Sequence, residues 1–253
     1  MTDAATRQLD AVLLAGGRAS RLGGVSKPGL TVGDRTLLQH AVDAAHAAGA
    51  ERIVVVGPPS LEAPGCLVVL EDPPFGGPVA AIAAGLAALD ADASRRSRGD
   101  ASRDPGARPA TSDVLVLACD LPTAADAVAR LTARRREPGE SGRGGEGEHG
   151  DGVHLVDADG RSQWLTGIYA RGALDRAFDA IGTPDGSAMR HLVASLDLLV
   201  VDDDGTAADI DTWHDLDLAR ARSRARARSP HRPPGPRPDP TTAEQHTTHE
   251  ESP

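Results

Sequence analysis

Residues 10–27 read DAVLLAGGRASRLGGVSK, and this stretch decides the fold. Asp10–Leu14 contains four consecutive apolar residues and passes directly into a run that holds four glycines. A short, continuous apolar run bounded by glycines is typical of a strand that is buried on both faces. We therefore predict a first strand at 10–14, followed by a glycine-rich loop.

The same alternation of apolar strands and helices continues along the chain. Further strands are predicted at 52–56, 66–70, 114–118, 153–156, 164–170 and 198–201. Helical spacing of apolar residues predicts helices at 37–48, 79–89, 124–134, 173–181, 188–195 and after Thr212. Continuous apolar strands separated by helices favour a three-layer, Rossmann-like α/β fold, in which helices cover both faces of a mostly parallel sheet.

The composition fits one such domain with added polar stretches. Hydrophobic residues make up 40% of the chain but aromatic residues only 2%, which suits Ala-faced helices packed on Val and Leu strands. Residues near 90–112 and 136–151 lack apolar periodicity, and so does the Arg/Pro-rich stretch 220–253. We expect a domain at 1–219 with two disordered insertions, and a disordered tail at 220–253.

Charge and residue spacing exclude several functional classes. The formal net charge of −10 disfavours binding to nucleic acid, because an acidic body repels the phosphodiester backbone. Neither a signal peptide nor a run of bilayer length is apparent, so we expect a cytoplasmic protein with no membrane partner. Cys66 and Cys119 follow no metal spacing, and no serine sits in a GxSxG elbow.

Glycines and carboxylates follow the predicted strands, at the edge where open α/β sheets bind ligands. The loop after the first strand is neither a Walker loop nor a GxGxxG fingerprint. Glycines nevertheless let backbone N–H groups approach phosphate oxygens, and Arg21 and Lys27 can neutralise phosphate charge. Lys27 is the single lysine among 27 basic residues. The alternative is an ordinary glycine-rich turn with solvated cations.

Isolated carboxylates are the candidate metal ligands. Asp120 lies just beyond the strand 114–118, where it is a natural Mg²⁺ ligand, because magnesium in phosphate sites uses one or two carboxylates plus substrate oxygens. Asp72 has a similar place but also suits a turn before prolines. Asp209 and Asp211 alternate with an apolar residue and share one side, so either one completes the metal site or both belong to a solvated acidic stretch.

The order LAGG…R…K, ED…GGP, CDLP and DIDTWHDL, over nearly the whole predicted core, resembles the molybdenum cofactor guanylyltransferases of the NTP-transferase superfamily. The resemblance implies a nucleotidyltransferase that uses Mg²⁺ at Asp120, GTP as donor and molybdopterin phosphate as acceptor. From the residues themselves we add Asp211 as the second metal ligand, and we expect Arg21, Lys27 and Asp120 to be the catalytic residues. The residues that the resemblance and the loop chemistry together assign to the nucleotide are Leu14, Ala15, Gly16, Gly17, Lys27, Asp72, Gly77 and Asp120.

The sequence departs from the family pattern at two places and leaves rivals open. Gly57 stands where many relatives carry Asn, and Trp213-His214 replaces Pro-Glu. The alternatives are a cytidylyltransferase for the same cofactor, a sugar-phosphate or phospholactate enzyme, and a nucleotide-binding protein without chemistry. The tail either contacts a partner, such as a molybdoenzyme apo-protein awaiting its cofactor, or is an inert extension.

Overall fold

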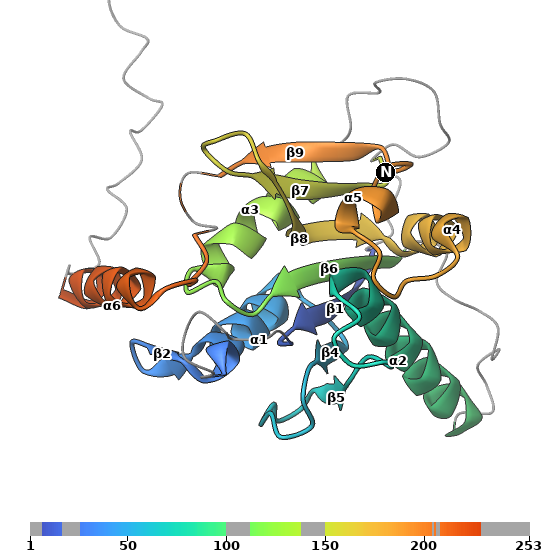
Figure 1. The fold of residues 1–253 in the computed structure, drawn as a ribbon, viewed down its shortest axis with the longest axis horizontal. Helices are drawn as coiled ribbons and strands as arrows, with labels where there is room; N and C mark the ends of the chain where they lie inside the picture. Colours follow the sequence, from blue (N-terminus) through green and yellow to red (C-terminus); the bar gives the residue numbers. More distant parts are fainter. Residues whose placement is uncertain are drawn as a thin grey trace, which may run out of the picture.

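A seven-stranded sheet forms the centre of the computed structural model, which describes residues 7–16, 26–99, 112–137, 150–203, 205 and 208–228, without the side chains of 97–99. Its strands run in the order β5-β4-β1-β6-β8-β7-β9 (Figure 1). Their bounds are β1 Gln8–Leu14, β4 Ile53–Val56, β5 Leu67–Val69, β6 Ser112–Ala118, β7 Gly152–Val156, β8 Ser162–Ala170 and β9 Leu198–Asp202.

The sheet is mostly parallel, as the continuous apolar strands indicated. Strand β1 pairs in parallel with β4 and with β6, so that Leu13 lies opposite both Val55 and Leu117. Strand β8 runs antiparallel to its neighbours β6 and β7, whereas β9 pairs in parallel with β7. The direction of β8 is the feature that the apolar pattern did not predict.

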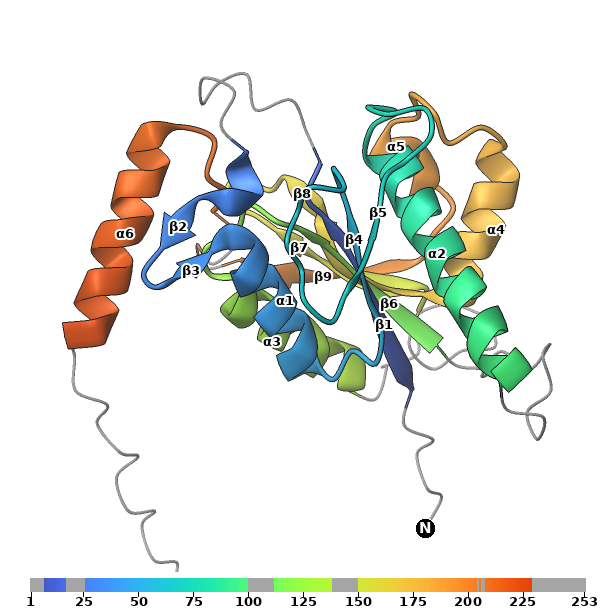
Figure 2. The same cartoon turned by 90° about the horizontal axis from the view of Figure 1, so that it is seen from below.

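Helices cover both faces of the sheet (Figure 2). Helices α1 (Leu37–Ala48) and α3 (Ala124–Arg136) lie on one face. Helices α2 (Pro78–Gly99), α4 (Arg171–Ile181) and α5 (Met189–Leu192) lie on the other. The predicted three-layer α/β architecture is confirmed.

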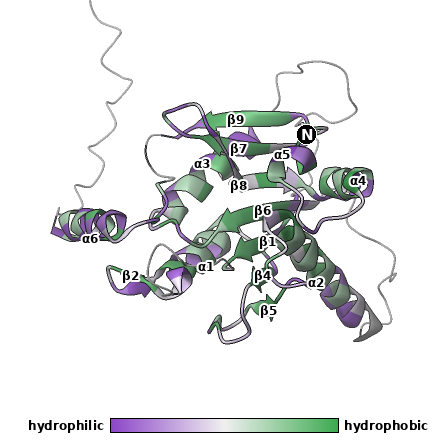
Figure 3. Cartoon of the chain, in the orientation of Figure 1, coloured by the Kyte–Doolittle hydropathy of each residue, from purple (hydrophilic) through white to green (hydrophobic). Residues whose placement is uncertain are grey.

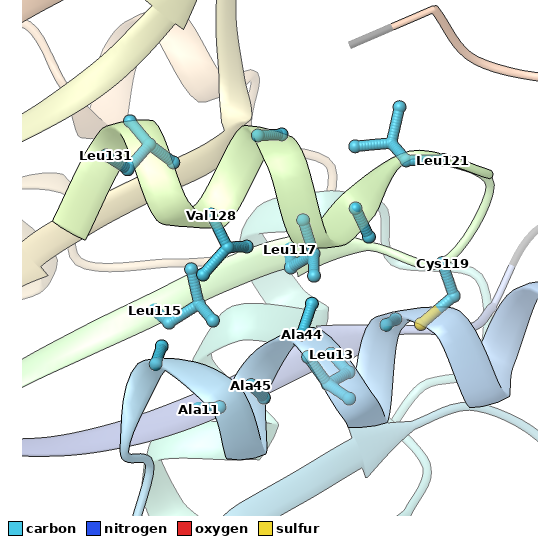
Figure 4. Packing of buried hydrophobic residues seen from close by; sticks show 14 of the residues in the cluster. Ala11, Leu13, Ala44, Ala45, Leu115, Leu117, Cys119, Leu121, Val128 and Leu131 are labelled. Carbon is cyan, nitrogen blue, oxygen red and sulfur yellow. The ribbon is translucent and has the colours of Figure 1, made fainter. Parts of the chain in front are cut away.

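Strand β1 shows why the apolar runs are continuous. Ala11 and Leu13 pack beneath α1 and α3 (Figure 4), whereas Val12 packs against α2, and all three are fully buried. Since neighbouring side chains of a strand point to opposite faces, a sheet covered on both sides needs apolar residues at every position. The strands of the sheet are accordingly hydrophobic along most of their length (Figure 3).

A small satellite core lies beside the main sheet. The short helix η2 (Lys27–Gly29) leads into a hairpin of β2 (Thr31–Val32) and β3 (Arg35–Thr36), and the last helix, α6 (Trp213–Arg228), packs against it. The buried residues of this cluster are Leu30, Val32, Leu37, Ile210, Leu216 and Ala219. The hairpin was not predicted, because its strands are only two residues long.

Two stretches that we predicted to be disordered are helical in their first part. Helix α2 continues to Gly99 and α6 continues to Arg228, so residues 90–99 and 220–228 are helical. Charged side chains stabilise both extensions without an apolar face: Arg96 pairs with Asp92 one turn before it at 2.7 Å, and Arg226 pairs with Asp126 of α3 at 2.8 Å. Residues 100–111, 138–149 and 229–253 lie outside the described residues, and Ser112 already belongs to β6.

Two further details bear on the sequence predictions. The predicted helix at 188–195 is shorter, at Met189–Leu192. Among the residues that the structure describes, none of the helices is long and apolar enough to cross a membrane.

The close packing of α2 on β1 gives a stability test. A Cβ added at Gly85 would lie 2.5 Å from Cγ1 of Val12, which is fully buried. Gly85→Ala normally favours a helix by about 1 kcal/mol, but here overpacking costs about 1–3 kcal/mol, so we expect net destabilisation in urea unfolding.

Gly172→Ala in α4 is the matched control, because its added Cβ would meet only Nη1 of Arg176, at 3.8 Å. This variant should be as stable as the parent or slightly more stable. An unfolding midpoint for Gly85→Ala at or above that of the parent would contradict the packing described for this face.

Candidate functional site

A cavity of about 370 Å³ opens at the carboxyl ends of β1 and β6. The chain leaves these two neighbouring strands in opposite directions across the sheet, since β4 and β5 lie on one side and β8, β7 and β9 on the other. Open α/β sheets bind ligands at such a switch point. The cavity is lined by Leu14, Gly16, Glu71, Phe75, Gly77, Pro78, Ala81, Ala118, Asp120 and Leu165.

Backbone hydrogen bonds hold the two strand ends together at the cavity. The N–H of Cys119 donates to the carbonyl of Leu14 at 3.0 Å, and the N–H of Ala15 donates to Val56 at 2.8 Å. A Cβ added at Gly16 would meet only the carbonyl oxygen of Val56, at 3.9 Å. The backbone at Gly16 is therefore anchored on one side and open on the other.

Lys27 lies between two carboxylates at this edge. Its Nζ is 2.5 Å from Oδ1 of Asp211 and 3.7 Å from Oδ2 of Asp120, and all three side chains are only partly exposed. Lys27 comes from the start of η2, Asp120 follows β6, and Asp211 precedes α6. Three segments far apart in the sequence thus bring one cation and two anions together.

The segment that carries Asp211 is fixed by a buried residue. Ile210 belongs to the satellite core, and its N–H donates to the carbonyl of Asp120 at 3.1 Å. Asp209 and Asp211 flank Ile210, and the charges of both act on Asp120. A reciprocal capping pair begins α6: Asp215 Oδ2 accepts from the N–H of Thr212 at 2.7 Å, and Thr212 Oγ1 accepts from the N–H of Asp215 at 3.2 Å.

Burial and neighbouring negative charge raise the pKa values of two carboxylates at this edge, Asp120 and Asp209. Burial, followed by the charges of Asp209 and Asp211, raises the pKa of the Asp120 carboxyl, and the Lys27 ammonium opposes the rise. Burial and the neighbouring Asp211 likewise raise the pKa of Asp209. Negative charge is thus concentrated here beyond what Lys27 balances, so a further cation would stabilise the cluster.

The carboxylate oxygens at this edge suit a Mg²⁺ ion whose coordination is completed by substrate oxygens. Asp120 and Asp211 present carboxylate oxygens to one point, which the Lys27 ammonium approaches. In the part of the chain that the structure describes, no group of three or more His, Cys, Asp or Glu side chains is arranged to hold a metal ion. Two carboxylates are nevertheless enough for magnesium in a phosphate site, where waters and phosphate oxygens supply the other ligands.

Helix α2 contributes its N-terminus to the cavity wall. Gly77, with a φ of 91°, turns the chain into Pro78, and Ala81 follows one turn later. The N–H groups of a first helical turn lack acceptors inside the helix and carry the positive end of its dipole. Hydrogen-bond donors of this kind suit an anionic or acceptor-rich ligand.

The structure brings together many of the predicted site residues and separates others. Leu14, Gly16, Gly77 and Asp120 line the cavity, and Lys27 contacts Asp120. Ala15 is buried behind the strand end. Gly17 and Arg21 lie outside the described residues.

The two acidic residues after β5 lie in different surroundings, and nucleotide contact by Asp72 stays a prediction. Asp72 is exposed and does not line the cavity, whereas its neighbour Glu71 is buried and does. Strand-end position marked Asp72, but only the backbone path decides which of the two residues turns inward. Phe75, Ala118 and Leu165 also line the cavity and were not singled out, since their apolar side chains resemble any other core residue.

Close packing explains why a glycine stands at position 57. A Cβ at this position would lie 3.1 Å from both the carbonyl carbon and the oxygen of Ala15, and 2.8 Å from Cδ1 of Leu61. Glycine therefore lets the chain after β4 pass close to the start of the glycine-rich loop. Where many relatives carry Asn, this chain has a glycine at a point where two backbone segments pass close together.

Comparison with known proteins is consistent with this geometry. The chain is 38% identical over 138 residues to a protein named molybdenum cofactor guanylyltransferase from Bradyrhizobium sp. (strain ORS 278). The alignment covers 53% of this chain and 58% of that relative, so it spans little more than half of either protein.

Solved structures share the fold at low sequence identity. A Mycobacterium sp. strain JC1 homologue of the Mycobacterium tuberculosis protein Rv0371c is 20% identical, with a TM-score of 0.58 over 86% of this chain and 97% of that one. The manganese complex of Rv0371c from M. tuberculosis H37Rv is 17% identical, with a TM-score of 0.50 over 85% of this chain and 98% of that one.

The family itself is shown by a match over most of the chain. The family model described as the MobA-like NTP transferase domain matches residues 11–199, from the first strand of the sheet into the last. This chain belongs to the family of MobA-like NTP transferase domains.

Proposed function

We propose that this protein is a cytoplasmic nucleotidyltransferase that transfers GMP from GTP to the phosphate of Mo-molybdopterin, forming the guanine dinucleotide cofactor and pyrophosphate. The observation that carries the proposal is the cluster of Lys27, Asp120 and Asp211 beside the open backbone of Gly16. Such a cluster combines a cation for phosphate charge with carboxylates for a divalent ion. The choice of GTP and molybdopterin is supported by the family and by the name of the bacterial relative.

The chain's own groups would act by positioning and charge neutralisation. Phosphoryl-type transfer needs the attacking and leaving oxygens in line and the phosphate charge neutralised, with no covalent protein nucleophile. The amides around Gly16 would hold the triphosphate, and Lys27 would leave Asp211 to neutralise charge on the departing pyrophosphate. The acceptor phosphate would attack the α-phosphorus from the opposite side.

Asp120 and Asp211 are the residues that would hold Mg²⁺. When bound, the ion supplies charge neutralisation and alignment of the phosphate oxygens. The raised pKa of Asp120 supports this assignment, because burial raises it most, and the like charges of Asp209 and Asp211, which a cation would relieve, raise it further although the Lys27 ammonium opposes them.

Lys27→Ala and Asp120→Ala should each lower turnover by about 10²- to 10³-fold, the usual cost of removing one charge-stabilising group. The assay is pyrophosphate release with GTP, Mg²⁺ and molybdopterin, followed by mass analysis of the product. Arg161→Ala and Asp159→Ala are the controls, since both side chains are well exposed and distant in sequence from the cluster.

Near-parental activity of either site variant would refute the assigned roles. Magnesium-dependent GTP binding by the parent without pyrophosphate release, when acceptor is supplied, would instead support a nucleotide-binding protein without chemistry.

Gly16→Ala tests the approach of phosphate to the backbone. The added methyl has room in the protein, whereas Gly16 lines the cavity, so we expect unchanged thermal stability and about tenfold or greater loss of Mg·GTP affinity by calorimetry. Gly29→Ala is the control, because its Cβ would meet no atom within 4 Å. Equal GTP affinity in both variants would argue against phosphate contact at Gly16.

Asp211→Asn separates metal binding from simple anchoring of Lys27. A metal ligand at this position predicts about tenfold weaker binding of GTP with Mg²⁺ and no weakening in excess EDTA. If Asp211 only restrains Lys27, the substitution should instead strengthen binding of GTP in EDTA, because the ammonium is released from its carboxylate. Calorimetric titrations under both conditions distinguish the two outcomes.

A further inference from the structure

The carboxylate of Glu71 is half satisfied. The residue is only 8% exposed, and its Oε1 accepts a hydrogen bond from the N–H of Phe75 at 3.0 Å. Its Oε2 is buried and has no hydrogen-bond partner among the described residues. Because Glu71 also lines the cavity, the missing donor is naturally supplied by a molecule that occupies it.

A buried carboxylate oxygen without a partner is costly to maintain. Removing such a group from water without replacing its hydrogen bonds destabilises the folded protein, and the penalty is larger for a charged group than for a neutral one. The hydrogen bond from Phe75 compensates for the burial of Oε1 and is part of the loop structure. The burial of Oε2 has no such compensation within the loop, which points to ligand recognition.

Glu71 stands apart from the Lys27 cluster. It follows β5, whereas Asp120 follows β6, and β4 and β1 lie between these strands. Three strand spacings place the two strand ends roughly 14 Å apart. A ligand that reaches both carboxylates must therefore be long, with its phosphates near Asp120 and its other end near Glu71.

The apolar lining of the cavity suits a flat, apolar group. Leu14, Ala81 and Leu165 contribute to it from β1, α2 and β8. Phe75 adds an aromatic ring at the edge: it is 63% exposed, in a chain with only 2% aromatic residues, and its φ of 68° is unusual for a residue other than glycine. Strained positions of this kind cluster at ligand clamps, and aromatic rings stack on nucleobases.

We infer that Glu71 is the residue that selects the base, by accepting the N1–H and N2–H₂ donors of guanine. This inference rests on the proposed function and deepens it. Guanine is the common base that presents two adjacent donors to a carboxylate. Adenine and cytosine place a ring-nitrogen acceptor beside their single amino group, and uracil flanks its N3–H with two carbonyls, so each sets an acceptor against the carboxylate.

The first turn of α2 completes the match to guanine. Pro78 and Ala81 of this turn line the cavity, but Pro78 has no N–H and that of Ala81 donates to Gly77. The N–H groups of Val79 and Ala80 between them would therefore be the donors to O6, which lies beside N1–H on the same edge of the base. Phe75 would stack on the base plane and, through its backbone N–H, would keep the Glu71 carboxylate in position.

The test is a change of nucleotide ranking in Glu71→Gln. The amide oxygen can keep the bond to Phe75, whereas its NH₂ replaces an acceptor by a donor opposite the 2-amino group. With Mg²⁺ present, calorimetry should show the parent binding GTP better than ITP, which lacks that amino group, and better than XTP, which has a carbonyl there. Glu71→Gln should bind GTP about 10- to 100-fold more weakly and should bind XTP more tightly than the parent does.

Two controls separate base selection from loop structure. Glu62→Gln makes the same chemical change at an exposed residue outside the cavity lining and should keep the parental ranking. Phe75→Ala should weaken GTP, ITP and XTP by a similar factor, roughly tenfold, because stacking depends little on the identity of the base. Thermal unfolding of each variant shows that the protein remains folded.

The inference and the proposed function fail in different ways. If the parent prefers GTP and Glu71→Gln keeps that preference, with no gain for XTP, then Glu71 does not read the base although the protein still binds GTP. If Glu71→Gln weakens all three nucleotides equally, Glu71 only shapes the loop, and the inference is overturned. If the parent binds none of them with Mg²⁺, the proposed function itself fails.

Discussion

The burial of strand β1 on both faces is the constraint on which the rest of the structure depends. Ala11 and Leu13 are covered by α1 and α3, and Val12 is in close contact with the backbone of α2 at Gly85. Pairing with β4 and β6 then fixes the register of β1, and therefore the position of its carboxyl end relative to theirs. Because close-packed interiors tolerate little displacement, the glycine-rich loop begins at one defined place beside the end of β6.

Charged residues have opposite uses at the two ends of the sheet. Near the amino ends of β1 and β6, Asp10 and Asp113 form bidentate ion pairs with Arg52 and Arg135, and these pairs fasten neighbouring elements. At the carboxyl ends, Asp120 and its acidic neighbours have Lys27 as a shared partner and remain at the cavity edge. Matched charges stabilise the fold, and excess negative charge remains where a cation and phosphates would bind.

The sequence predicted the architecture better than the extent of its elements. Helix α1 has the predicted bounds, Leu37–Ala48, since its capping box and its C-terminal Gly49 are both encoded locally. Residues 90–99 and 220–228 were assigned to disorder because they lack an apolar face, yet ion pairs within and between helices order them. Such pairs depend on which helices become neighbours, which periodicity does not reveal.

By itself, the sequence determined the parallel sheet, the strand ends and the glycine-rich loop, because periodicity and glycine placement are local properties of the chain. It also marked Gly16 and Asp120, which line the cavity. Only the tertiary structure decided that Glu71 rather than Asp72 turns inward, that Leu165 of the antiparallel strand closes the cavity wall, and that Lys27 meets Asp211 across 184 residues. The physical reason is that the direction of a side chain in a loop, and contacts between distant segments, follow from the packing of whole elements.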